Sequence, residues 1–407
     1  MPGSRSLGSP SQPASGVVSQ RSAIEPFHVM EVLKAAQLRE RSHGDLILMC
    51  VGQPSTPAPL VVREAAKAAL DSSPLGYTDA TGILPLREAI ARHHREWYDI
   101  EVSAEDVMVM TGSSGVFSTL FLAAFDVGDV VAMIRPGYPA YRNTLTAMGC
   151  EVLELECGQD TRYQPTLSML QALPAPPAGL IVASPSNPTG TVIDPAELAE
   201  IATWCEHNDC LLISDEIYHG ITYGPPAASA WQTSRQAVVV GSISKYFSMT
   251  GWRLGWALVP PHLRRPMEIL AQNLTICPPA ISQHAALAAF GPAAAQELDA
   301  HVQRYADNRA FLARRLPELG LASATVPDGA FYVWCDIGHL TEDSVAWCQG
   351  VLADTGVALT PGVDFDIAAG HRMMRMSFSG STAEVDEGIT RLTGSAWLSA
   401  EQAPLLP

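Results

Sequence analysis

Lysine is scarce in this sequence. Only three of the 407 residues are lysines (Lys34, Lys67 and Lys245), and acidic residues outnumber basic ones by 42 to 25, which gives a formal charge of −17. A chain this acidic is not expected to bind nucleic acid, whose phosphates need basic partners. Any chemistry that needs a lysine amine therefore has three candidates.

Paired cysteines and uninterrupted apolar segments are also missing. The eight cysteines form no CxxC pair and no zinc-finger spacing with histidine, so we expect a reduced, cytoplasmic protein. Residues 269–296 carry no Asp, Glu, Lys or Arg, but amides and prolines interrupt them, which favours buried core over a membrane span. Residues 1–21 have no apolar signal core, and we expect a flexible tail there.

The rest of the chain has the composition of a large packed core, with 47% apolar and 16% charged residues. Short apolar runs alternate with helical patterns, which predicts an α/β protein with a mostly parallel sheet flanked by helices. Such runs form strands that are buried on both faces and present functional residues at their ends. The runs are residues 107–112, 130–136, 179–185, 210–216, 237–245 and 255–260.

The pattern changes near residue 296. A long charged helix is predicted over 297–316, followed by shorter strands at 330–337 and 373–378. We therefore predict a large domain over 53–295 and a smaller α+β domain formed by 22–52 and 296–407.

Lys245 differs from the other two lysines. Lys34 and Lys67 lie in helical patterns where a solvated lysine is the ordinary expectation, whereas Lys245 follows the apolar run AVVVGSIS. A buried ammonium must pair with a carboxylate or be used chemically. Position alone leaves both interpretations open.

Several neighbours of Lys245 suit a phosphate-bearing ligand beside a Schiff-base lysine. Ser242, Ser244 and Arg253 supply hydroxyls and a guanidinium close to the amine. A second set of donors is expected from Ser113 and Ser114, in a glycine-serine turn between a strand and a helix, since helix N-termini bind phosphate.

Three further polar residues follow buried strands. Asp215 and Tyr218 lie in SDEIY, and Asn187 lies in the turn SNPTG. A carboxylate at a strand end can cap a helix or bind metal, but no cluster of His or carboxylates at ligand spacing supports a metal. Beside a lysine and a phosphate, it could instead pair with a pyridinium nitrogen.

Together these motifs resemble those of the pyridoxal-phosphate enzymes of fold type I, and most closely the class I/II aminotransferases of the aspartate aminotransferase superfamily. The resemblance runs from Ile24 to Leu392. It implies that Lys245 forms the Schiff base with pyridoxal 5'-phosphate and moves the substrate proton. It further implies that Asp215 holds the pyridine N–H and that Asn187 and Tyr218 bond the ring oxygen. The implied phosphate ligands are Ser113, Ser114, Ser242, Ser244 and Arg253.

The resemblance extends to the substrate and to a partner. It implies that Tyr138 in RPGYPAY stacks on the ring and that Arg375, rather than Arg372, grips the substrate α-carboxylate beside Gly52 and Asn187. It also implies a homodimer in which Tyr77 reaches the phosphate of the neighbouring active site.

The expected reaction is a ping-pong transfer of the amino group of an L-amino acid to a 2-oxo acid. Ser113 and Ser114 stand where some aspartate aminotransferases carry a lysine, so we expect neutral or aromatic donors rather than aspartate. Three alternatives remain: a C–S β-lyase or related elimination enzyme, a cyclopropane-forming synthase, and the ligand-sensing domain of a transcription regulator. The last would need a DNA-binding module, for which the N-terminal tail is too short.

Overall fold

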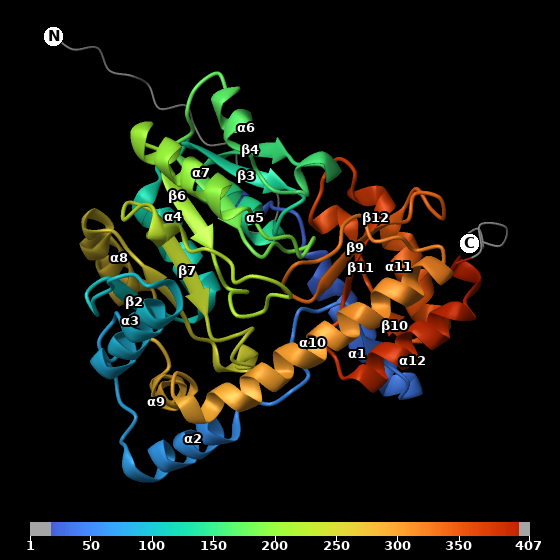
Figure 1. Cartoon of the computed structure of the whole chain (residues 1–407), viewed down its shortest axis with the longest axis horizontal. Coiled ribbons are helices and arrows are strands. Elements are labelled where there is room, and N and C mark those ends of the chain that lie inside the picture. The colour runs from blue at the N-terminus through green and yellow to red at the C-terminus, as the bar shows by residue number, and fades with distance from the viewer. Residues whose placement is uncertain (1–17, 399–407) are drawn as a thin grey trace.

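The computed structural model describes residues 18–398, so most of the predicted tail lies outside the described residues. Figure 1 shows a larger part built on one sheet and a smaller part beside it. The helices are α1 (His28–His43), α2 (Leu60–Ser72), α3 (Leu84–Tyr98), α4 (Gly112–Ala124), α5 (Pro139–Met148), α6 (Leu167–Gln171), α7 (Pro195–His207), α8 (Pro261–Leu274), α9 (Ala280–Ala289), α10 (Pro292–Glu318), α11 (Ser344–Thr355) and α12 (Thr382–Thr393). The strands are β1 (Ile47–Leu48), β2 (Val107–Met110), β3 (Val130–Arg135), β4 (Glu151–Glu156), β5 (Gly179–Ala183), β6 (Leu211–Asp215), β7 (Val238–Ser242), β8 (Gly255–Leu258), β9 (Tyr332–Asp336), β10 (Val357–Ala358), β11 (Thr360–Pro361) and β12 (Met373–Ser377).

The larger sheet confirms the predicted fold class. Its seven strands lie in the order β2-β8-β7-β6-β5-β3-β4, and only β8 runs antiparallel to its neighbours. The carboxyl ends of all the other strands therefore meet at one edge. In α/β sheets that edge is where ligands bind.

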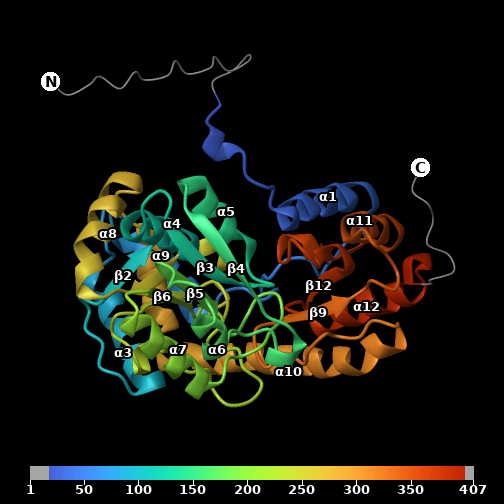
Figure 2. The same ribbon diagram turned by 90° about the horizontal axis from the view of Figure 1, so that it is seen from above.

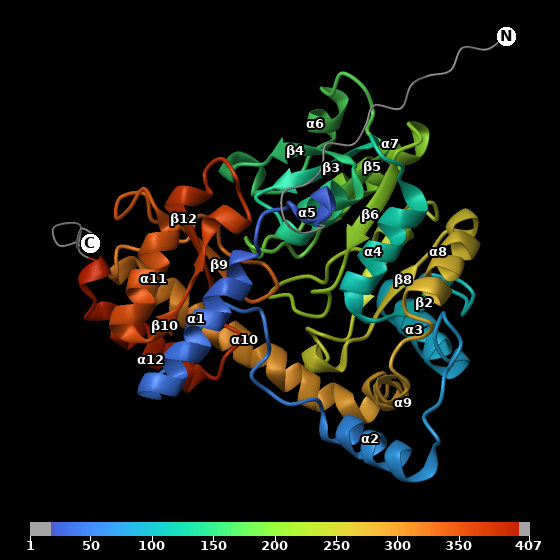
Figure 3. The same cartoon turned by 180° about the vertical axis from the view of Figure 1, so that it is seen from behind.

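Helices cover both faces of this sheet. Successive strand residues alternate between two apolar clusters: Val107 and Val109 face one cluster, while Met108 and Met110 face the other. The second cluster is closed by α4, α5 and α8, as Figure 3 shows for α4 and α5. Burial on both faces explains why these strands read as continuous apolar runs.

The smaller part contains the antiparallel sheet β11-β12-β9 and the parallel pair β1-β10. Helix α1 packs on β11 and α11. Helix α10 runs along both parts, with one end near α9 (Figure 1) and the other beside α12 (Figure 2). This arrangement is compatible with the predicted domains, but their boundaries near residues 53 and 296 remain a prediction.

Several sequence expectations need correction. Helix α10 begins at Pro292, earlier than predicted, and the sequence did not predict the edge strand β4, because three glutamates interrupt the apolar residues of EVLELE. The uncharged segment 269–296 is buried only in part, since Leu274 and Ile276 are exposed. None of the helices within residues 18–398 is both long and apolar enough to cross a membrane.

Candidate active site

Lys245 lies just beyond β7, and its amine points into a cavity of about 490 Å³ at the carboxyl edge of the sheet. Its Nζ donates a hydrogen bond of 2.7 Å to the carbonyl of Gly52. Burial, with the nearby charges of Arg375 and Arg253, lowers the pKa of Lys245 to about 8. A larger fraction of the amine is therefore neutral and nucleophilic near neutral pH than for an exposed lysine. Lys34 and Lys67 are both exposed, on α1 and α2.

Asp215 ends β6 and lines the same cavity. It is 3% exposed, and burial raises the pKa of its carboxyl to about 6, although hydrogen bonds from Tyr141 and from the backbone of Ile217 oppose this rise. A buried carboxylate that still has an open direction toward a cavity is suited to hold a cationic N–H.

Arg375 is held at the other end of the cavity by strand β12. It is 2% exposed and donates to Asn187 Oδ1 at 2.8 Å, and also to the carbonyl of Cys50. Its Nε has no partner among the described residues. Arg372 instead lies at the surface, paired with Asp336. Arg375 is thus the arginine that is placed to bind a carboxylate in the cavity.

Two tyrosines, Tyr218 and Tyr332, also line the cavity. The hydroxyls of Tyr218 and Tyr332 lie 2.6 Å apart. Residue 52 must be glycine here, because a Cβ would lie 1.6 Å from the Tyr332 hydroxyl. The backbone of Gly52 can therefore approach both Tyr332 and Lys245.

The phosphate-binding residues suggested by the sequence gather at the start of α4. Ser113 and Ser114 lie in its first turn, and no side chain caps this helix. Arg253 packs so closely that a Cβ on Gly112 would lie 2.4 Å from its Nη2. Ser244 also lines this end of the cavity. Free helix N–H groups, a guanidinium and a hydroxyl form a donor set that fits a phosphate.

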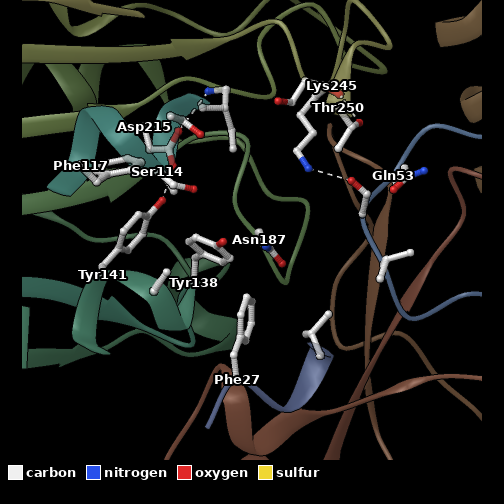
Figure 4. A pocket seen from close by; sticks show the side chains of 18 of the residues that line it. Phe27, Gln53, Ser114, Phe117, Tyr138, Tyr141, Asn187, Asp215, Lys245 and Thr250 are labelled. Atoms are coloured by element: carbon white, nitrogen blue, oxygen red, sulfur yellow. Dashed lines mark hydrogen bonds between the residues drawn. The ribbon is translucent and has the colours of Figure 1, made fainter. Parts of the chain in front are cut away.

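The ring of Tyr138 lines the cavity, with Tyr141, Asn187 and Phe27 around it (Figure 4). It contacts Tyr141 and Phe27 edge-to-face, with centroid distances of 5.3 and 5.9 Å. An aromatic ring held in this way can stack on a planar ligand.

The structure brings together most of the residues that the sequence suggested, and these line one cavity: Gly52, Ser113, Ser114, Tyr138, Asn187, Asp215, Tyr218, Ser244, Lys245, Arg253 and Arg375. Two do not line it. Ser242 points to Ser244, with a distance of 2.9 Å between their hydroxyl oxygens, so its position suits holding Ser244 rather than direct contact with a ligand. Tyr77 is 84% exposed at the surface.

Sequence reasoning missed several residues of the cavity. Tyr141 and Tyr332 act through partners that are distant in sequence, and Thr250 and Phe117 carry no distinctive motif. One side of the cavity is formed by the start of α1, which the sequence assigned only to the small domain; the lining residues there are Phe27, just before the helix, and Val29, Met30 and Leu33 within it.

The residues present fit pyridoxal phosphate, the cofactor that the resemblance implied. The donors around α4 suit its phosphate, Asp215 suits its pyridine nitrogen and Lys245 suits its aldehyde. Arg375, which lines the cavity, suits a substrate carboxylate.

Comparisons with known proteins show the family of the chain. Residues 44–392 match the family of class I and II aminotransferases. The chain is 52% identical to a valine–pyruvate aminotransferase of Mycobacterium tuberculosis, over 94% of this chain and 99% of the relative. It is 32% identical to an aspartate/prephenate aminotransferase of Thermus thermophilus, over 92% of this chain and 97% of the relative.

Solved structures give the same result. A crystal structure of an aminotransferase from Mycobacterium tuberculosis superposes with a TM-score of 0.91 at 52% identity, covering 93% of this chain and 98% of that one. The aspartate aminotransferase of Thermus thermophilus with maleate gives 0.88 at 30% identity, covering 93% and 99%. The chain therefore belongs to the class I and II aminotransferases and is a pyridoxal-phosphate-dependent transaminase of fold type I.

Proposed function

We propose that this enzyme takes its amino group from a neutral L-amino acid, with branched apolar donors preferred over aspartate, and passes it to a 2-oxo acid in a ping-pong reaction. The observation that carries this proposal is the charge of the cavity. Among the described residues that line it, the cations are Lys245, Arg253 and Arg375. Each would hold the cofactor or the α-carboxylate, which leaves no cation among these lining residues of the chain for the side chain of a dicarboxylic donor.

The wall of the cavity that is formed by the start of α1 supports the same donor class. The side chains that α1 contributes are apolar, and Val51 packs against the same apolar cluster as Val29. An apolar wall favours a branched or aromatic side chain and leaves a second carboxylate without compensation for lost hydration. The valine–pyruvate relative at 52% identity also supports a branched donor.

The chain's own residues would act as follows. Arg375, steadied by Asn187, holds the donor's α-carboxylate, and this fixes the Cα–H bond relative to Lys245. Lys245, once its amine is free and neutral, would take the proton from Cα and deliver it to C4′ of the cofactor. Pyridoxal phosphate, when bound, supplies the electron sink for the pair left on Cα. The carboxylate of Asp215 strengthens that sink by keeping the pyridine nitrogen protonated.

The phosphate would be held by the first-turn N–H groups of Ser113 and Ser114, by the Ser244 hydroxyl and by Arg253. Tyr138 would stack on the ring, while Tyr218 would bond the ring oxygen. Ser242 would act indirectly, through its hydrogen bond with Ser244.

We also propose a homodimer in which Tyr77 reaches the neighbouring subunit's phosphate. The exposure of Tyr77, together with that of the apolar residues Leu274 and Ile276, supports such an interface. A cytoplasmic location completes the proposal and is supported by eight unpaired cysteines.

A half-reaction screen tests the donor. The holoenzyme is mixed with each amino acid, and conversion of the cofactor to its amino form is followed by absorbance. We expect kcat/KM for valine or leucine to exceed that for aspartate by at least about tenfold, since an unpaired carboxylate would have to be desolvated. A higher value for aspartate contradicts the proposed donor.

Incubation with cystathionine separates transamination from elimination. A transaminase consumes amino donor beyond one equivalent per active site only when a 2-oxo acid is present. Release of pyruvate and ammonia without an acceptor would instead identify a C–S β-lyase.

A further inference from the structure

The first turn of α1 is held by a carboxylate from a distant part of the sequence. Asp364, in the loop between β11 and β12, accepts hydrogen bonds from the backbone N–H groups of His28 (2.9 Å) and Val29 (2.7 Å). The residue at the N-cap position, Phe27, makes no side-chain capping bond. Because Asp364 is 2% exposed, these bonds are shielded from water. A carboxylate at a helix N-terminus is stabilised by the free N–H groups and the helix dipole.

The segment held by Asp364 is the part of α1 that faces the active-site cavity. Phe27, Val29, Met30 and Leu33 all line the cavity and belong to the first two turns or precede them directly. In Figure 4, Phe27 lies next to Tyr138, on the side of the cavity away from Lys245. The bonds to Asp364 therefore fix the position of an apolar wall.

The residues that follow Asp364 contact other parts of the site. The Phe365 ring lies 4.7 Å from the Arg375 guanidinium, and the Phe365 carbonyl accepts from the N–H of Gly137, next to Tyr138. Asp366 forms a 2.9 Å ion pair with Arg135 at the end of β3. The loop therefore contacts the α1 wall, Arg375 and the larger sheet, and it holds these three parts of the site together.

We propose that Asp364 is a positioning residue for donor selectivity, because it fixes α1 at the distance where a branched side chain packs against the apolar wall. This inference rests on the proposed function and names a determinant of its donor preference. A valine side chain reaches the wall and gains binding free energy by burying apolar surface there, whereas the single methyl group of alanine buries less surface and gains much less.

The kinetic test compares valine with alanine in Asp364→Ala. We expect kcat/KM for valine to fall about tenfold, mainly through KM, while that for alanine changes by less than about threefold, since only uniform binding at the wall is lost. Asp194→Ala is the matched control, because Asp194 caps α7 through the N–H groups of Ala196 and Glu197, and α7 contributes nothing to the cavity lining. Equal losses for both donors, or the same selectivity change in the control, would overturn the inference.

A second readout does not depend on activity. Hydrogen exchange of the backbone amides of residues 28–33 should become about tenfold faster in Asp364→Ala and stay unchanged in Asp194→Ala, because only the former loses its cap. Unchanged exchange in Asp364→Ala contradicts the inference. If wild-type enzyme transfers no amino group from either donor, the proposed function fails, yet this measurement still tests the hold of Asp364 on α1.

A further pair of variants covers the case in which Asp364→Ala does not fold. Leu33→Ala shortens the wall without touching the cap, and Asp364→Asn keeps an acceptor oxygen. We expect Leu33→Ala to lower the valine-to-alanine ratio of kcat/KM about fivefold and Asp364→Asn to lower it less. An unchanged ratio in Leu33→Ala would show that α1 is not the selecting wall.

Discussion

At the scale of single residues, the site depends on buried groups whose pKa values are shifted from their ordinary values. Lys245 has a lowered pKa and Asp215 a raised one, and burial is the largest cause for both. The motif SISK identified the lysine, but its environment depends on Gly52 and Arg375, which are distant in sequence. The sequence could therefore predict most of the residues that line the cavity, whereas their proton affinities required the folded arrangement.

The lowered pKa of Lys245 predicts how the apoenzyme captures its cofactor. Only the neutral amine attacks an aldehyde, so the capture rate should rise about tenfold per pH unit below about 8 and level off above it. Arg375→Gln removes a neighbouring positive charge and should move this midpoint upward. Stopped-flow absorbance gives the rate. A wild-type midpoint near the ordinary lysine value of 10.5 is incompatible with the buried geometry.

Asp215 predicts a conflict between stability and activity. Its pKa is raised above the ordinary 3.8, so the folded apoprotein binds this proton more tightly than the unfolded chain, and stability decreases as the pH rises from about 4 to about 6. At pH 7.5, apo Asp215→Asn should therefore unfold with about 1–3 kcal/mol more free energy than wild type, while transamination falls at least about a hundredfold. Urea unfolding of both proteins at about pH 4 and at pH 7.5 measures the difference in the free energy of unfolding. An Asp215→Asn variant that is less stable than wild type at pH 7.5 would show that burial of the ionised carboxylate does not destabilise the folded apoprotein.

At the scale of secondary-structure elements, the parallel sheet was predictable because its strands are buried on both faces. Edge strand β4 was not, since only part of it is covered and its charged residues break the apolar pattern. The role of α1 in the cavity was also hidden, because its carboxylate cap lies 335 residues away along the chain. Local sequence patterns carry no signal for such contacts.

The close approach of Gly52 to β9 gives a test at this scale. Gly52→Ala would place a Cβ 1.6 Å from the Tyr332 hydroxyl, so Tyr332 must move and its contact with Tyr218 must be lost. We expect kcat to fall at least about tenfold, as one well-placed hydrogen bond is lost and Lys245 shifts. Gly224→Ala is the control, since its Cβ would meet nothing within 4 Å. Activity unchanged in both variants would place Tyr332 outside the working site.

At the scale of the whole molecule, the two parts meet along α10 and around the cavity, so both the cofactor end and the substrate end of the site depend on their packing. The fold type was recognisable from the order of motifs. The partner subunit was implied only by the resemblance of the segment around Tyr77, a residue that lies at the surface of a single chain.

Hybrid dimers test that partner contact. If Tyr77 serves the neighbouring site, Tyr77→Ala and Lys245→Ala should each lower activity, and mixing the two after subunit exchange should recover about a quarter of wild-type activity at equal amounts. That fraction follows because half of the dimers are mixed and each contains one intact site. Sedimentation gives the oligomeric state in parallel. No recovery from exchanged dimers would mean that Tyr77 acts within its own chain or not at all.

The most direct test of the central claim identifies the lysine that binds the cofactor. Purified protein is loaded with pyridoxal phosphate, its visible absorption band is recorded, and the bond is fixed with borohydride before peptide mapping. We expect one modified lysine per chain, at Lys245, with the band lost in Lys245→Ala and kept in Lys34→Ala and Lys67→Ala, because the latter two lie exposed on α1 and α2. A band that persists in Lys245→Ala, or a label on either of the other lysines, would contradict the site described above.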